Sequence, residues 1–163
     1  MNETYQIHEF GPFYDADSEI LILGSFPSVK SRETGFYYGH PINRFWKLLA
    51  FLYQEEEPVS IPEKKAFLKK CHIALWDVIE SCDITGSSDS SIRNEKINDI
   101  GKILQEAPIR AIYANGRKAE NLYKKYAEPV TGRKITGLPS TSPANAAFSM
   151  ERLQAGWRKL TEK

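Results

Sequence analysis

The stretch with most chemical information runs from Gly35 to Trp46 and reads GFYYGHPINRFW. Three consecutive aromatic residues stand between two glycines and fit no regular amphipathic period. Aromatic rings on a glycine-flanked loop are suited to stacking on a planar ring such as a nucleobase. We therefore predict that Phe36 and Tyr37 bind a base, with packing in the core as the alternative for each ring.

Two polar residues follow the aromatic triplet. Histidine can gain or lose a proton near neutral pH, so His40 is a candidate acid, base or base-binding group. Asn43 is expected in the first turn of a helix, where its amide offers both a donor and an acceptor. That pair can bind the edge of a base or orient a water. The alternative for both residues is a capping or loop hydrogen bond.

Two further segments follow apolar runs. In GSFPS, Gly24 permits a sharp turn, Pro27 fixes φ, and the exposed N–H groups from Ser25 to Ser28 could hold a flat polar ligand or a phosphate. The segment is no P-loop, because the GK[ST] ending is absent. In LPSTSPAN, small hydroxyl side chains before a helix suit a phosphate oxygen, with a plain capping loop as the alternative.

These segments are placed by strands that alternate with helices. Apolar runs predict strands, and apolar residues three or four apart predict helices. Residues 83–93 are rich in Ser, Gly and Asp, which predicts a long loop. Strands are expected at 19–24, 72–77, 109–114 and 134–138, and helices at 41–53, 60–70, 94–107, 117–127 and 142–160.

This alternation predicts an α/β sandwich around a parallel sheet. Ligands bind outside the carboxyl ends of such strands, and of the loops after Leu23, Asp77 and Leu138 the first and last are rich in Ser, Pro and Gly, so the site should lie there. The length of 163 residues fits one domain over 1–163. Two cysteines, no signal peptide and no apolar run of 18 residues predict a cytoplasmic protein without disulfides or a membrane span. None of the three histidines has metal-ligand spacing, so we expect no metal.

Charge is distributed unevenly along the chain. The first 109 residues hold 11 Lys and Arg against 17 Asp and Glu, whereas residues 110–163 hold 11 against four. A net charge of +1 thus combines an acidic part with a basic part. A basic face that carries the LPSTSPAN loop and meets a polyanion is one interpretation, and solvated helix faces whose charges never gather are the other.

The order GSFPS, FYYGHPINRFW, LWD and LPSTSPAN resembles the uracil-DNA glycosylase superfamily, and most of all its hypoxanthine-DNA (deoxyinosine) glycosylases. The likeness spans roughly residues 8 to 160. It implies a three-layer α/β/α sandwich with a central four-stranded parallel sheet. It also implies that a monomer, without metal or cofactor, removes a deaminated base from double-stranded DNA.

The resemblance assigns roles to the candidate residues. Asn43, Ser25 and Phe26 would be catalytic, and Asn43 matches the asparagine needed for deoxyinosine excision. Residues that would bind the base are Phe36, Tyr37, His40, Pro27 and Ser28. Residues that would bind DNA are Ser140, Thr141, Ser142, Asn145, Arg133 and Lys134, with Arg117 and Lys118 as further positive charge.

The chain also departs from related families. Phe26 stands where mismatch-specific uracil enzymes have an asparagine, and GQDPY enzymes an aspartate, for the attacking water. Asp77 could activate that water instead, or anchor a loop. Ser142 stands where mismatch-type enzymes have a leucine that fills the gap left by the base. A uracil or G:T mismatch glycosylase, or a non-catalytic nucleotide-binding module, are the alternative functions.

Overall fold

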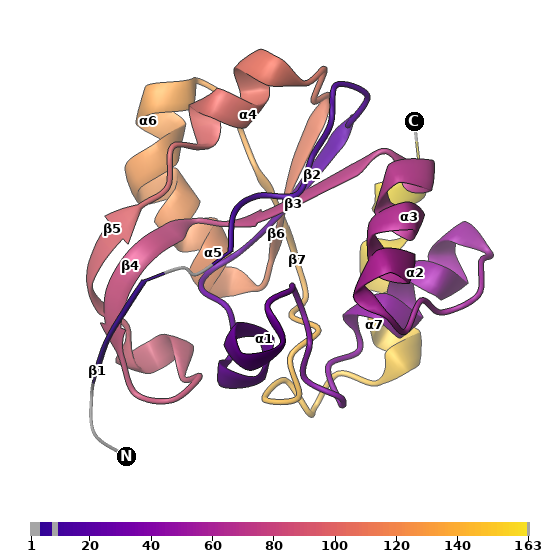
Figure 1. The fold of residues 1–163 in the computed structure, drawn as a ribbon, viewed down its shortest axis with the longest axis horizontal. Coiled ribbons are helices and arrows are strands. Elements are labelled where there is room, and N and C mark those ends of the chain that lie inside the picture. Colours follow the sequence, from indigo (N-terminus) through magenta and orange to yellow (C-terminus); the bar gives the residue numbers. More distant parts are fainter. Residues whose placement is uncertain (1–3, 8–9, 163) are drawn as a thin grey trace.

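The computed structural model describes residues 4–7 and 10–162. Its centre is a parallel sheet in the order β3–β2–β6–β7 (Figure 1). The four strands are β2 (Ile20–Gly24), β3 (Ile73–Asp77), β6 (Ala111–Asn115) and β7 (Thr136–Leu138). Each coincides with an apolar run, and the predicted four-stranded parallel sheet is confirmed.

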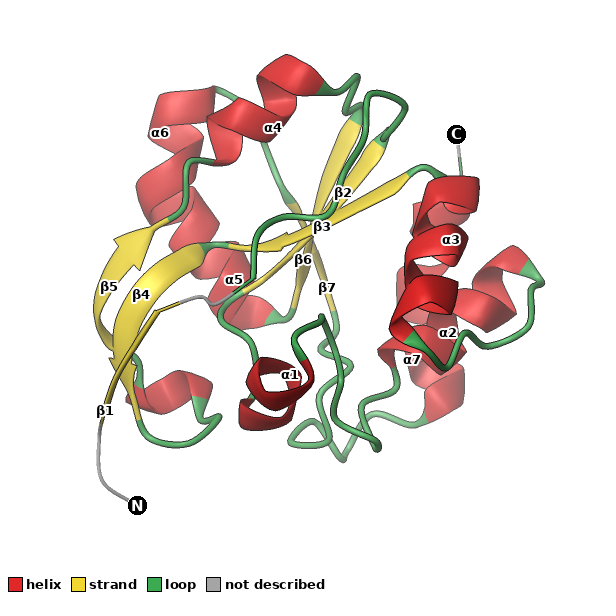
Figure 2. Ribbon diagram, in the orientation of Figure 1, coloured by secondary structure: helices red, strands yellow, loops and turns green. Residues whose placement is uncertain are grey.

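Side chains of β2 alternate between two buried faces. Ile20 and Ile22 pack toward one group of helices, whereas Leu21 and Leu23 pack toward the other. The two groups lie on opposite sides of the sheet (Figure 2). One side holds α2 (Phe45–Tyr53), α3 (Ile61–Cys71) and α7 (Met150–Trp157), and the other holds α4 (Ile100–Glu106), α5 (Arg117–Leu122) and α6 (Glu128–Thr131). The predicted three-layer sandwich is confirmed.

A second, antiparallel sheet flanks the first and was not predicted. Its order is β1–β4–β5, formed by β1 (Thr4–Ile7), β4 (Ile79–Ile84) and β5 (Arg93–Ile97). The predicted helix over 94–107 is therefore wrong in its first part, and helix α4 begins only at Ile100. The backbone of β5 pairs with β4, with Ile97 opposite Ile79, and this long-range pairing overrides the local helical pattern.

One short helix was not predicted, and two predicted helices differ in extent. The unpredicted helix α1 (Val29–Thr34) follows the first loop, with Ser28 as its N-cap. Helix α2 begins at Phe45, so Asn43 precedes the helix. The predicted helix over 117–127 is α5 followed by one π-helical stretch over Tyr123–Ala127.

The last helix also begins later than predicted. Helix α7 starts at Met150 with Ser149 as N-cap, whose hydroxyl accepts from Arg152 N at 3.2 Å. Residues 139–148 stay in a loop of turns beside the carboxyl end of β7. None of the helices in the described residues is both long and apolar enough to cross a membrane.

Candidate active site

A cavity of about 1460 Å³ lies at the carboxyl ends of the parallel strands. Its volume exceeds the about 300–1,000 Å³ of typical small-molecule pockets. Eleven of the predicted site residues line it: Ser25, Phe26, Pro27, Ser28, Tyr37, His40, Asn43, Ser140, Thr141, Ser142 and Asn145. Phe36, Arg133 and Lys134 are not among the lining residues.

Asn43 presents an amide to this cavity with its oxygen already engaged. Its Oδ1 accepts from Phe45 N at 3.0 Å and from Thr141 Oγ1 at 2.8 Å. The first bond satisfies the backbone N–H of Phe45, the first residue of helix α2, and the second crosses to the loop after β7. Because both bonds use the oxygen, the orientation of the amide is fixed and its NH2 group is left as a donor for a ligand.

Thr141 connects Asn43 to the sheet. Its side chain is fully buried, and its hydroxyl also accepts from Asn115 Nδ2 at 3.0 Å. In return, Thr141 N donates to Asn115 Oδ1 at 3.0 Å. The predicted DNA-binding residue Thr141 thus has its polar groups engaged inside the protein, where they position Asn43. Asn115, at the end of β6, was not predicted as a site residue.

Arg44 holds the loop after β7 open. Its guanidinium donates to the carbonyls of Ser142 and Asn145, both at 3.1 Å, and to that of Phe148. The carbonyls of Ser142 and Asn145 also accept from Asn145 N at 2.9 Å and Phe148 N at 3.1 Å, which are bonds of turns and not of an α-helix. The loop therefore wraps around the Arg44 side chain, and Phe148 joins the cavity lining.

The glycine at the end of β2 allows the buried Asp77 carboxylate and the buried hydroxyl of Tyr38 to approach the backbone. A Cβ at Gly24 would lie 2.4 Å from Asp77 Oδ1 and 3.2 Å from the Tyr38 hydroxyl oxygen. Both residues line the cavity, and Asp77 is 3% exposed. The first loop therefore requires glycine at this position for packing as well as for turning.

The aromatic triplet divides between core and cavity. Phe36 is buried and stacks on Trp46, with ring centroids 6.2 Å apart. Tyr37 is also buried and donates its hydroxyl to Gly11 O at 2.9 Å, although part of it reaches the cavity. Tyr38 has φ of 54° and lies face to face with Phe45, with centroids 3.9 Å apart. Burial raises the pKa of the Tyr38 hydroxyl, which keeps it a neutral donor.

The serine-rich segment after β4 folds back over the first loop. Ser25 donates its hydroxyl to Asp89 Oδ1 at 2.6 Å. Val29 N donates to Ser87 Oγ at 2.9 Å. Asp89 lines the cavity and was missed at the sequence level, because its segment carries no periodic pattern. Neighbouring protein atoms partly desolvate the carboxylate of Asp89, although the residue as a whole is exposed, and this raises its pKa; the Ser25 hydrogen bond opposes the rise.

The charged groups around the cavity are mostly acidic. Its lining holds the carboxylates of Asp77, Asp89 and Glu120 and one guanidinium, that of Arg117. Such a lining favours positive charge that develops inside it. In the described part of the chain, no group of three His, Cys, Asp or Glu side chains could hold a metal ion.

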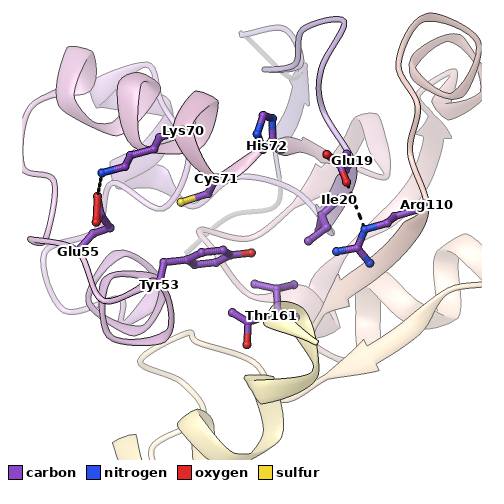
Figure 3. Close-up of a pocket in the computed structure, with 10 residues that line it drawn as sticks. Glu19, Ile20, Tyr53, Glu55, Lys70, Cys71, His72, Arg110 and Thr161 are labelled. Atoms are coloured by element: carbon purple, nitrogen blue, oxygen red, sulfur yellow. Dashed lines mark hydrogen bonds and ion pairs between the residues drawn. The ribbon is translucent and has the colours of Figure 1, made fainter. Parts of the chain in front are cut away.

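Arg133 and Lys134 lie at the other end of the sheet. They precede the amino end of β7, and the Arg133 guanidinium donates to Ile109 O at 2.8 Å. At this amino edge is a second hollow of about 300 Å³ (Figure 3). Its charges pair with one another, since Lys70 binds Glu55 and Arg110 Nε lies 3.5 Å from Glu19 Oε1. The large cavity at the carboxyl edge is therefore the candidate active site.

The three-layer α/β/α fold and the cavity at the carboxyl ends of its parallel strands define an α/β protein with a ligand site at this edge of the sheet. Residues 12–161 match the profile of the Uracil DNA glycosylase superfamily. The chain belongs to that superfamily and is a DNA glycosylase.

Two relatives and one solved structure match the chain over most of its length. A protein named "Hypoxanthine DNA glycosylase" from Methanosarcina acetivorans is 39% identical over 156 residues, which cover 93% of this chain and 95% of the relative. One of the same name from Methanosarcina barkeri is 34% identical over 159 residues, covering 94% and 97%. A solution NMR structure from Methanosarcina acetivorans, assigned to the uracil DNA glycosylases, matches with a TM-score of 0.77 at 38% identity, covering 93% of this chain and 96% of that one.

Proposed function

We propose that this chain hydrolyses the N-glycosidic bond of deoxyinosine in double-stranded DNA and leaves an abasic site. The observation that carries the proposal is the Asn43 amide, whose oxygen is engaged within the protein and whose NH2 group is left for the cavity. The two relatives named hypoxanthine DNA glycosylases support the choice of base.

In the proposed reaction the base is flipped out of the duplex, enters the cavity and is then released from its sugar. Hypoxanthine is held in a weak pair, so flipping it costs less than flipping a normal base. The ring enters between the GSFPS loop and the Asn43 amide, with Phe26 as the aromatic surface from the first loop. As the bond to the sugar breaks, negative charge develops on the base. The Asn43 NH2 group and the N–H groups of the first loop stabilise that charge, which lowers the barrier.

The loop after β7 contacts the DNA backbone. Ser140 Oγ accepts from Ser142 N at 3.1 Å, and Ser142 Oγ accepts from Ala144 N at 3.1 Å. Both hydroxyls keep a proton to donate to a phosphate oxygen. Asn145 supports this loop from inside, because its side chain donates to Ser140 O at 3.0 Å. Monomeric action without a metal is part of the proposal.

Three duplexes test the choice of base. Each carries one hypoxanthine, one uracil or one G:T mismatch, and alkali cleavage after incubation detects an abasic site. We expect rapid release of hypoxanthine and slow or no release of the other two bases. Preferred release of uracil or thymine would favour a mismatch-type enzyme. Tight binding of the deoxyinosine duplex without an abasic product would favour a non-catalytic module.

A further inference from the structure

The hydrogen bond from Ser25 fixes one carboxylate at the rim of the cavity. The position that supplies a water ligand in related families is occupied by Phe26, whose ring is 8% exposed and lies under the Arg32 guanidinium at 5.4 Å. A phenyl ring cannot orient a water molecule through hydrogen bonds. We propose that Asp89 orients and deprotonates the attacking water, an inference that rests on the proposed base hydrolysis.

The other two carboxylates of the lining are less suitable. Asp77 is 3% exposed and packs against the backbone of Gly24. Glu120 is paired with Lys124 Nζ at 2.8 Å. Asp89 is exposed at the rim, where solvent reaches it. A flipped nucleotide enters base first, so its sugar stays near the rim and close to Asp89.

Several hydrogen bonds hold Asp89 and its segment against the first loop. Ser25 Oγ donates to Oδ1 at 2.6 Å, which leaves Oδ2 as an acceptor for water. The rest of the segment is held at Ser87 by Val29 N and at Gly86 by the Arg32 guanidinium, whose Nη2 lies 3.2 Å from the Gly86 carbonyl oxygen. The carboxylate is thus prearranged before DNA arrives.

The charges around Asp89 suit a general base. The protein atoms around its carboxylate raise its pKa above the ordinary aspartate value by desolvation, and the negative charge of Asp77 raises it further. The Ser25 hydrogen bond and the positive charge of Lys118 act in the opposite direction. Arg117 from α5 and the neutral Tyr38 hydroxyl complete the polar surroundings. A carboxylate with a raised pKa accepts a proton more readily than a free one.

The step balances as a hydrolysis. The bond from C1′ to N9 breaks, and its electron pair leaves with the base as an anion. The water oxygen forms a bond to C1′ and its proton passes to an Asp89 oxygen. Solvent then protonates the base and takes the proton from Asp89. The acidic lining stabilises the cationic sugar between these events.

The test compares Asp89→Asn with wild type in single-turnover release of hypoxanthine. We expect a rate at least 100-fold lower with the dissociation constant for the deoxyinosine duplex within about twofold. The wild-type rate should rise with pH as Asp89 loses its proton, and this rise should be absent from the variant. Formate should partly restore the rate of Asp89→Ala, whereas a merely structural role would not respond to it.

Two other variants complete the design. Asp99→Asn, exposed at the start of α4 and outside the cavity lining, should keep the wild-type rate. Ser25→Ala should lose about tenfold, because Asp89 keeps its charge and loses its anchor. The assignment would be overturned if the Asp89→Asn rate lies within threefold of wild type, or if the rate of that variant still rises with pH as the wild-type rate does.

The choice of substrate separates this inference from the proposed function. If the wild type releases uracil in place of hypoxanthine, the proposed base is wrong and the same comparison on the uracil duplex still decides the role of Asp89. If no duplex yields an abasic site, both proposals fail.

Discussion

The sharpest test of the site is Asn43→Asp. An aspartate keeps an oxygen for the Phe45 N–H and for the Thr141 hydroxyl, which bind Oδ1 at 3.0 and 2.8 Å. It removes the NH2 donor and adds a negative charge. Asp and Asn accept equally well from an N–H at a helix start, so we expect the free energy of unfolding to change by less than about 1 kcal/mol.

The effect on rate should be much larger than the effect on stability. Loss of one donor aimed at developing charge costs about 3 kcal/mol, which is roughly 100-fold in rate. The complementary variant is Asn43→Ala, which removes the capping oxygen together with the donor. We expect Asn43→Ala to lose similar activity and also about 1 kcal/mol of stability, or about 2–4 °C in Tm.

The assay is single-turnover release of hypoxanthine, with duplex binding and thermal unfolding measured in parallel. Asn121→Asp makes the same charge change on the exposed side of α5 and should behave as wild type. If Asn43→Asp keeps more than a third of the wild-type rate, its amide is not the donor that stabilises the leaving base. A large loss of Tm in the same variant would show that its oxygen contacts were not preserved.

Three further predictions concern the walls of the cavity. Gly24→Ala should lower Tm by several degrees, because its Cβ would meet Asp77 Oδ1 at 2.4 Å and overpacking costs about 1–3 kcal/mol; Gly11→Ala, with open space around it, is the control, and equal Tm values would refute this. Ile42, 63% exposed and located between the lining residues His40 and Asn43, is expected to fill the gap left by the flipped base, so Ile42→Ala should slow excision in duplex more than in single-stranded DNA; equal slowing contradicts it. Arg117→Ala should reduce the slope of log K against log salt by about 1, as measured by fluorescence anisotropy, and an unchanged slope would place Arg117 outside the interface.

The parallel sheet could be predicted because its strands are encoded locally. A run such as Ile20–Gly24 is apolar without alternation, which is typical of a strand buried on both faces. Gly24 and Pro27 likewise indicated a loop at the carboxyl end of this strand. The strand at Arg93–Ile97 could not be predicted in the same way, because its partner β4 is formed by residues 79–84 and the pairing depends on the tertiary fold.

The sequence also could not predict which of the aromatic rings faces the cavity. Phe36 and Tyr38 are two residues apart and equally aromatic, but Tyr38 adopts a left-handed backbone conformation that turns it toward Asp77 while Phe36 packs on Trp46. Asp89 was missed for a similar reason. Only the path of β4, which returns the serine-rich segment to Ser25, brings this carboxylate to the cavity.

One residue, Arg44, links the loop after β7 to the start of α2. Ser142 and Pro143 are suitable for a helix start, but the carbonyls of Ser142 and Asn145 accept from the Arg44 guanidinium and from N–H groups three residues ahead, as in turns. The same Arg44 precedes Phe45, the first residue of α2, and its N–H donates to Thr141 O at 3.2 Å. Arg44 therefore holds the second loop beside the Asn43 amide. In the proposed mechanism, the adjacent Asn43 and Arg44 link the group that binds the base to the loop that contacts the DNA backbone.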